Sequence, residues 1–259
     1  AASWNNDGSS GDEKTLSVYK FDGTTDKSAY VDMWDLGPTA GMLLHEVASQ
    51  LVTSLGRVMV SISWSPDGRY IATASTDLVA QHVQVFSFDG GFIGTPDLGL
   101  TIADSSRPTI DWSPIGRFIV LANTTSIGVL YFGDDQSLHL PGSAYLLTSQ
   151  QAPLTPVVWS PDGKYVGYAF FPDVDTPYTG VIRFNGTALV DPIFKPTDPL
   201  SEVPINSIDW SACGKWIVTG GDWGTYGVLP ERSLVVIQQA MTCPENCVVK
   251  NCTIADVHA

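Results

Sequence analysis

Apolar and polar residues alternate in the segment before each of four similar turns. In the first segment, Val60, Ile62 and Trp64 are separated by serines, which is the period of a half-buried strand. After the turn, a second apolar segment opens with a basic residue and then an aromatic one in all four copies. The pattern predicts a β-hairpin at each of the four places.

The four turns follow one template, Trp-Ser-Pro-Asp-Gly, and each copy begins with a tryptophan: Trp64, Trp112, Trp159 and Trp210. Successive tryptophans lie 48, 47 and 51 residues apart. The turn glycine is kept in every copy, because a tight turn needs a backbone conformation that a Cβ hinders: Gly68, Gly116, Gly163 and Gly214. This period indicates a repeat architecture in which the tryptophans pack in the core.

A third strand is predicted after each hairpin. Three copies of it end in Asp-Gly or Asn-Gly, a strong signal for a further hairpin, at residues 22–23, 89–90 and 185–186. Each unit therefore holds three strands and a variable segment long enough for a fourth. Four-stranded sheets repeated at this spacing are typical of the blades of a β-propeller.

Over roughly residues 1–240 these repeats resemble WD40-like and TolB-type β-propellers. The resemblance implies an all-β fold of about five four-stranded blades. The chain departs from the WD pattern because no Gly-His pair precedes the blades, and because Phe88, Phe132 and Phe184 stand where the family's Trp usually ends a strand. The buried Asp-His-Ser-Trp network of typical WD repeats is therefore not carried over.

The domain organisation is predicted from the same repeats. Residues 1–23 resemble the second half of a blade, and further repeats start near residues 24, 89, 133 and 185. The tail, residues 241–259, is expected to add a strand that closes the ring in a blade composed of both termini. Alternatively it pairs with a neighbouring subunit or begins another domain. In the connector 38–57, apolar residues at helical spacing predict one short helix, with a longer strand pair as the alternative.

Composition and charge restrict the partners. The chain has 259 residues, which suits one all-β domain, and a net charge of −14 with only 13 Lys and Arg. Such a surface repels phosphate backbones, so we expect no nucleic-acid partner. No apolar run approaches the ~20 residues of a membrane-spanning helix, so we expect no membrane insertion.

Cysteines and sequons favour an extracellular or cell-surface location over the cytosol or periplasm. The disulfide candidates are Cys213, Cys243, Cys247 and Cys252, with reduced thiols as the alternative. Their spacing does not match a structural zinc site, and we expect no metal and no cofactor. Three Asn-x-Ser/Thr sequons are candidate glycosylation sites: Asn123, Asn185 and Asn251.

Ligand-binding candidates come from the loops between the second and third strands of the blades, which gather on one face of a propeller. Aromatic residues beside carboxylates could stack on sugar rings or bind a cation there. The alternative is that they are solvated turn residues without a ligand. The candidates are Trp4, Asp7, Asp77, Asp173, Asp175, Tyr178, Asp222, Trp223 and Tyr226.

No catalytic residues are predicted. The histidines are scattered, and the sequence contains neither a Gly-x-Ser-x-Gly elbow nor a glycine-rich phosphate loop. We therefore favour a non-enzymatic extracellular module for structure or protein interaction, which self-assembles through its terminal strands into an oligomer or filament. The alternatives are a lectin-like carbohydrate-binding propeller and a glycoside hydrolase with two opposed carboxylates.

Overall fold

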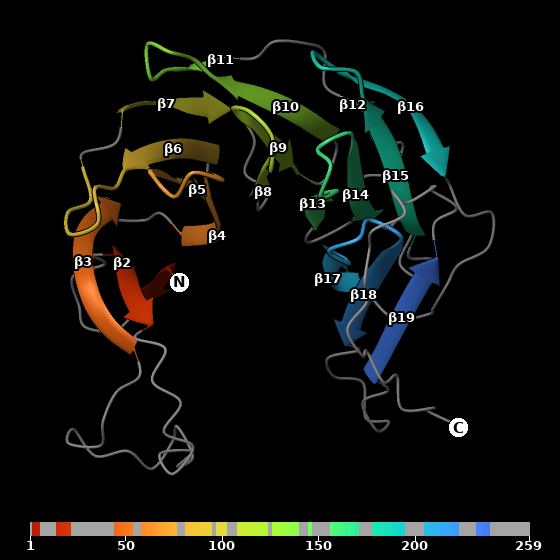
Figure 1. Ribbon diagram of the computed structural model, residues 1–259, viewed down its shortest axis with the longest axis horizontal. Helices are drawn as coiled ribbons and strands as arrows, with labels where there is room; N and C mark the ends of the chain where they lie inside the picture. The colour runs from red at the N-terminus through yellow and green to blue at the C-terminus, as the bar shows by residue number, and fades with distance from the viewer. Residues whose placement is uncertain are drawn as a thin grey trace. The chain divides into compact units, whose positions relative to one another are not determined.

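The computed structural model describes thirteen segments of the chain: residues 2–5, 14–21, 44–53, 58–76, 81–94, 97–102, 108–123, 126–139, 145–146, 156–170, 178–194, 205–222 and 232–238. These segments contain nineteen β-strands in five antiparallel sheets and no helix (Figure 1). The chain divides into two compact units, Ala1–Ser105 and Ser106–Ala259. The predicted closing strand in residues 241–259 lies outside the described residues.

The first unit contains two sheets, whose strands are hydrogen-bonded in chain order. Sheet I consists of β1 (Ala2–Asn5), β2 (Lys14–Phe21) and β3 (Leu44–Thr53). Sheet II consists of β4 (Val58–Trp64), β5 (Tyr70–Thr76), β6 (Gln81–Ser87) and β7 (Asp97–Ile102).

The second unit contains three sheets. Sheet III consists of β8 (Thr109–Trp112), β9 (Phe118–Ala122), β10 (Ser126–Phe132), β11 (Leu138–His139) and β12 (Tyr145–Leu146), where both β11 and β12 pair with β10. Sheet IV consists of β13 (Val157–Trp159), β14 (Tyr165–Phe170), β15 (Tyr178–Phe184) and β16 (Leu189–Phe194). Sheet V consists of β17 (Ile205–Trp210), β18 (Trp216–Asp222) and β19 (Arg232–Gln238).

All four tryptophan hairpins are confirmed. Each tryptophan ends the first strand of a hairpin and pairs with an Ile or Val on the second, as Trp64 does with Ile71 and Trp159 with Val166. The four turn glycines have φ between +65° and +76°, the left-handed region that favours glycine. The turn therefore depends on its glycine more than on Pro-Asp, which the fourth copy lacks.

The helix predicted in the connector 38–57 is wrong. Residues 44–53 form strand β3, which pairs with β2 along its whole length. The register shifts twice, leaving Val47 and Val52 as extra residues without a direct partner on β2. Each bulge adds one residue to β3 and so interrupts the alternation of apolar and polar positions. The apolar residues therefore fall at spacings that resemble those of a helix.

The core repeats one aromatic contact in three sheets. The tryptophan that ends the first strand meets, edge to face, a phenylalanine that ends the third strand or directly follows it. The ring centroids are 5.4 Å apart for Trp64–Phe88, 5.7 Å for Trp112–Phe132 and 5.1 Å for Trp159–Phe184. Phe88, Phe132 and Phe184, the departures from the WD pattern, thus complete the packing of each sheet.

Neighbouring sheets of the second unit bury each other's apolar faces. One core cluster joins Val120 and Val129 of sheet III to Trp159 and Tyr168 of sheet IV. The indole Nε1 of Trp159 also donates a hydrogen bond of 3.1 Å to the backbone carbonyl of Asp111 on sheet III. A sheet of this size cannot hide its faces alone, so the fold is built by stacking.

Asp67 organises the first of the four turns. Its carboxylate accepts hydrogen bonds from the Ser65 hydroxyl at 2.6 Å and from Arg69 Nε at 2.7 Å. These hydrogen bonds, the one from Ser65 above all, lower the pKa of Asp67 to about 2. Asp162 repeats the serine contact at 2.7 Å, whereas the other two turns have Ile115 and Cys213 at this position.

We expect Gly180→Ala to destabilise the protein. Gly180 on β15 lies opposite Tyr168, and a Cβ there would be 2.3 Å from the buried tyrosine ring. Overpacking of this kind costs about 1–3 kcal/mol, which the midpoint of urea unfolding would report. Gly91→Ala is the control, because a Cβ at Gly91 has no atom within 4 Å. Equal midpoints for the two variants would contradict the packing around Tyr168.

We expect Asp67 to stabilise the protein in a pH-dependent way. Its pKa is about 2 in the folded protein and 3.8 in the unfolded chain, so its contribution is complete above pH 4 and is lost as the pH falls through 2. Because the side chain is 43% exposed, solvent screening reduces the contribution to about 1 kcal/mol.

The measurement compares the unfolding free energies of wild type and Asp67→Ala between pH 6 and pH 2. The difference in unfolding free energy between wild type and Asp67→Ala should become smaller below pH 4. Asp67→Asn, which retains the oxygen that accepts from Ser65 but has no charge, should show a pH-independent stability offset from Asp67→Ala. A constant difference between wild type and Asp67→Ala over the whole range would contradict the prediction.

Candidate functional site

Most of the predicted ligand-binding residues lie outside the described residues: Asp7, Asp77, Asp173, Asp175, Trp223 and Tyr226. The backbone places the other three in strands. Trp4 is in β1 and pairs with Leu16, Tyr178 begins β15, and Asp222 ends β18. The carbohydrate or cation site on these loops therefore stays a prediction.

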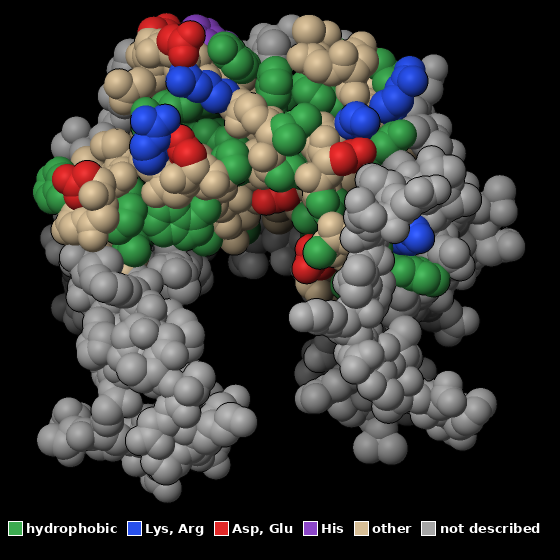
Figure 2. Space-filling view, in the orientation of Figure 1, with side chains coloured by type: hydrophobic (Ala, Val, Ile, Leu, Met, Phe, Trp, Pro, Cys, Tyr) green, Lys and Arg blue, Asp and Glu red, His purple; other side chains and the backbone are tan. Residues whose placement is uncertain are grey.

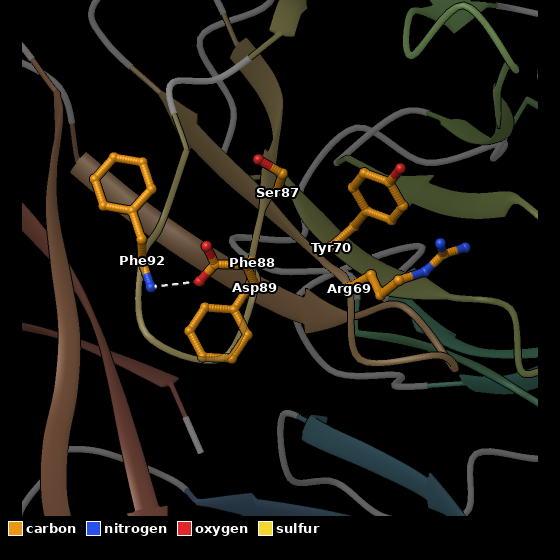
Figure 3. A pocket seen from close by; sticks show the side chains of 6 residues that line it. All are labelled: Arg69, Tyr70, Ser87, Phe88, Asp89 and Phe92. Carbon is orange, nitrogen blue, oxygen red and sulfur yellow. Dashed lines mark hydrogen bonds between the residues drawn. The ribbon is translucent and has the colours of Figure 1, made fainter.

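A shallow depression lies on sheet II at the strand ends that carry the tight turns. The loops between the second and third strands, which hold the predicted ligand-binding residues, are at the other end of the strands. The depression has a volume of about 180 Å³, and we call it the turn-end depression. Figure 3 shows the residues that line it: Arg69, Tyr70, Ser87, Phe88, Asp89 and Phe92. Tyr70 begins β5, Ser87 ends β6, and the Asp89-Gly90 turn brings Phe92 beside them.

The local sequence fixes the geometry of this depression. The backbone N–H of Phe88 donates to the carbonyl of Arg69 at 2.7 Å, which extends the β5–β6 pairing into the turn. Gly90 follows with φ +102°, and the Asp89 carboxylate then accepts hydrogen bonds from the backbone N–H of Gly91 at 3.0 Å and of Phe92 at 2.8 Å. Phe92 is thus held with its side chain 62% exposed.

Charges of both signs line the turn-end depression. The two backbone hydrogen bonds, first that from Gly91, lower the pKa of Asp89, so this carboxylate is ionised. The guanidinium of Arg69 pairs with Asp67 and lies 5.9 Å from the centre of the Tyr70 ring. Figure 2 shows the same combination on a larger scale, with basic, acidic and hydrophobic side chains intermixed on one face.

Phe92 is not among the residues predicted from the sequence. The available signal was an aromatic residue directly after the Asp-Gly-Gly of a hairpin turn. At the corresponding place, the turn of sheet III has Asp-Gln and that of sheet IV has Thr-Ala. Phe92 therefore stands out as a large ring where the other two copies have a polar or a small side chain.

A serine, a histidine and an aspartate meet in the turn between β10 and β11. The Ser137 hydroxyl lies 2.7 Å and the Asp135 carboxylate 3.4 Å from Nε2 of His139. In a catalytic triad the serine and the carboxylate contact different ring nitrogens, so that the histidine can pass a proton between them. Both groups contact the same nitrogen here, and the arrangement is therefore a turn contact.

The predicted modification sites differ in exposure. The Asn123 side chain is buried, and its Oδ1 accepts hydrogen bonds from the backbone N–H and the hydroxyl of Ser126. Asn185 is exposed at the turn between β15 and β16, and its Oδ1 accepts from Thr187 and Ala188. Asn251 and the cysteines Cys243, Cys247 and Cys252 lie outside the described residues, so the disulfide stays a prediction.

In the described segments, no three or more His, Cys, Asp or Glu side chains are grouped so that they could hold a metal ion. The described segments also contain no helix that is long and apolar enough to cross a membrane.

Comparison of the sequence with family models finds the "WD domain, G-beta repeat" at residues 49–80 and 197–225. The first match ends beyond the hairpin β4–β5, and the second includes the hairpin β17–β18. Comparison with curated protein sequences finds no match.

Solved structures share the fold at low sequence identity. The periplasmic gluconolactonase of Pseudomonas aeruginosa is 16% identical with a TM-score of 0.60, over 90% of this chain and 63% of that one. A functionally unknown protein from Desulfotomaculum acetoxidans DSM 771 is 16% identical, with a TM-score of 0.56 over 80% of this chain and 57% of that one. Hydrazine synthase of Kuenenia stuttgartiensis is 13% identical, with a TM-score of 0.56 over 75% and 54%.

The chain thus spans between about half and two thirds of the length of these three structures. At such identities the likeness concerns the fold alone. Repeated tryptophan hairpins, five antiparallel sheets and repeat-model matches on two hairpins agree that the fold is a β-propeller with WD40-like repeats.

Proposed function

We propose that this propeller is a non-enzymatic module for structure and protein interaction, acting outside the cell. The turn-end depression carries the proposal, because its rim holds Phe92 with 62% of the side chain exposed. Aromatic residues and arginine are enriched among the residues that dominate binding energy at protein interfaces. Here Phe92, on the turn after β6, lines the same depression as Arg69 and Tyr70 of the β4–β5 turn.

The rigidity of this turn favours binding. The backbone of Phe92 is fixed by Asp89, and its neighbour Ile93 is buried and bridges to Phe88. A partner side chain that packs on Phe92 therefore orders little of this protein, which keeps the entropic cost of association low.

The chemistry of the depression does not favour catalysis. Its lining includes one carboxylate, Asp89, whose Oδ1 already accepts two backbone hydrogen bonds. Glycoside hydrolysis needs two opposed carboxylates, and acyl transfer needs a nucleophile beside a base. The gluconolactonase among the solved structures shares the fold. The residues that line the depression do not form either of these two pairs.

The charge of the chain restricts the kind of partner. A net charge of −14 favours a neutral or basic protein segment over an acidic one. An apolar side chain of such a segment would cover Phe92, and its basic groups would face Asp89. The lectin-like role and self-assembly through the terminal strands stay predictions, since they depend on residues outside the described ones.

We expect Phe92 to dominate binding of peptides. In selection of a random peptide library on the immobilised protein, enriched peptides should carry an apolar residue near basic ones. Phe92→Ser should weaken the binding of these peptides by at least about tenfold, measured by fluorescence anisotropy.

Ile115→Ser is the matched control, because Ile115 is also exposed, at 51%, and lies in a turn of the other unit. It should leave peptide affinity unchanged. The role proposed for the turn-end depression is wrong if no selected peptide is sensitive to Phe92→Ser.

We expect Asn185 to carry a glycan when the protein is secreted from animal cells. A glycan needs the Asn side chain in solvent, which Asn185 offers and the buried Asn123 does not. Asn185→Gln should remove one glycan from the mass spectrum. Asn123→Gln should leave the glycan mass unchanged and lower the unfolding midpoint, because it disrupts the hydrogen bonds to Ser126. Unglycosylated Asn185 in the secreted protein would contradict this prediction.

A further inference from the structure

Within the second unit, sheet IV packs on sheet III along one seam and on sheet V along another. Each seam contains the tryptophan that ends the first strand of the later sheet, which is Trp159 at the III–IV seam and Trp210 at the IV–V seam. Trp159 is 3% and Trp210 is 6% exposed, so the two indoles are buried to a similar extent. The polar contacts of the two seams can therefore be compared directly.

Two hydrogen bonds cross the III–IV seam, and both go to Asp111 of sheet III. The backbone N–H of Trp159 donates to Oδ2 of Asp111 at 2.8 Å, and its indole Nε1 donates to the Asp111 carbonyl at 3.1 Å. Phe118 of sheet III adds a ring contact with Phe184, at 4.9 Å between centroids. Separating these two sheets would break hydrogen bonds as well as expose apolar surface.

The corresponding contacts of the IV–V seam differ. Sheet IV has Val158 where sheet III has Asp111, and Val158 packs on the cluster around Trp210. With no carboxylate at that position, the backbone N–H of Trp210 donates to Asp209 of its own strand, at 2.8 Å. The buried indole Nε1 of Trp210 has no hydrogen-bond partner among the described residues.

A glycine lets the Trp210 indole lie directly on the backbone of sheet IV. Gly167 pairs with Val158, and a Cβ at Gly167 would lie 3.0 Å from the indole nitrogen. In sheet III the residue that pairs with Asp111 is Val120, whose side chain fills the equivalent space.

A second polar group is buried unpaired at the IV–V seam. Thr179 lies opposite Ala169, which packs on Ile205 of sheet V, and its Oγ1 has no hydrogen-bond partner among the described residues. A buried polar group without a partner raises the free energy of the closed seam, and exposure to water removes this penalty. Opening the IV–V seam thus satisfies two polar groups, whereas opening the III–IV seam breaks two hydrogen bonds.

We propose that the IV–V seam is the opening point of the second unit. Sheet V separates there as a unit, with the pairing of β17, β18 and β19 intact, while sheets III and IV stay joined. Such partial openings, in which one cooperative element leaves the rest of the fold in place, are a general property of proteins. The opening point goes beyond the proposed interaction role, whose turn-end depression belongs to the first unit.

The experiment measures hydrogen exchange of the full chain by nuclear magnetic resonance at several low concentrations of urea. The indole proton of Trp210 should exchange at least about tenfold faster than that of Trp159, because only the Trp159 seam is held by hydrogen bonds from the tryptophan. Its rate should rise with urea, which indicates an opening that exposes surface. The backbone N–H groups of β18 should exchange more slowly than the Trp210 indole, because sheet V stays paired.

Asp111→Val gives the III–IV seam the residue type that the IV–V seam has. It should accelerate exchange of the Trp159 indole proton and leave that of Trp210 unchanged. Asp111→Asn is the matched control, because it retains an oxygen that can accept from the Trp159 backbone, and its Trp159 rate should stay close to that of wild type.

The comparison of the two indole protons in wild type does not depend on how the variants fold. The proposal is overturned if the Trp210 indole exchanges as slowly as that of Trp159, or if urea leaves its rate unchanged. Backbone N–H groups of β18 that exchange as fast as the Trp210 indole would show that sheet V unfolds and does not separate as a unit. A Trp159 rate that Asp111→Val does not change would overturn the role given to Asp111.

Discussion

The burial of one sheet's aromatic residues by the neighbouring sheet is the interaction on which this fold depends. An isolated three- or four-stranded sheet has two faces and cannot bury both. Trp159 illustrates how a neighbouring sheet covers one face. Its indole packs on Phe184 and donates a hydrogen bond to a backbone carbonyl of sheet III, and Phe118 of sheet III packs on Phe184. Each such aromatic contact contributes about 0.5–1.5 kcal/mol beyond the area that it buries.

The sequence allowed much of this fold to be predicted, because the repeat imposes the same local chemistry at every turn. A glycine with positive φ is needed wherever the first strand reverses, so Gly68 and Gly214 mark turns even though their neighbours differ. The failure in residues 44–53 has a local cause. The pairing of β3 contains two bulges, and a strand whose alternation is interrupted twice cannot be distinguished from a helix by periodicity.

The candidate site was less predictable, because it depends on register and exposure and not on residue type. Phe88 was recognised as a departure from the WD pattern, but its neighbour in space, Phe92, had no motif to mark it. The hydrogen-bonded turn at Asp89 brings them together. Its Asp-Gly-Gly sequence is that of an ordinary polar turn, so the sequence gives no sign that the ring of Phe92 is exposed there. The predicted loop residues rested on their chemistry alone, and chemistry without geometry does not select a site.

Functional surfaces in a repeat protein are found where one copy departs from the others. The aspartate position of the four tryptophan turns holds Asp67, Ile115, Asp162 and Cys213. At the first residue of the following strand, the fourth copy has Trp216 where the other copies have Tyr or Phe. In sheet II the departure is Phe92, an exposed ring at a turn position where sheets III and IV have Gln136 and Ala188, and this departure is the basis of the proposed interaction surface.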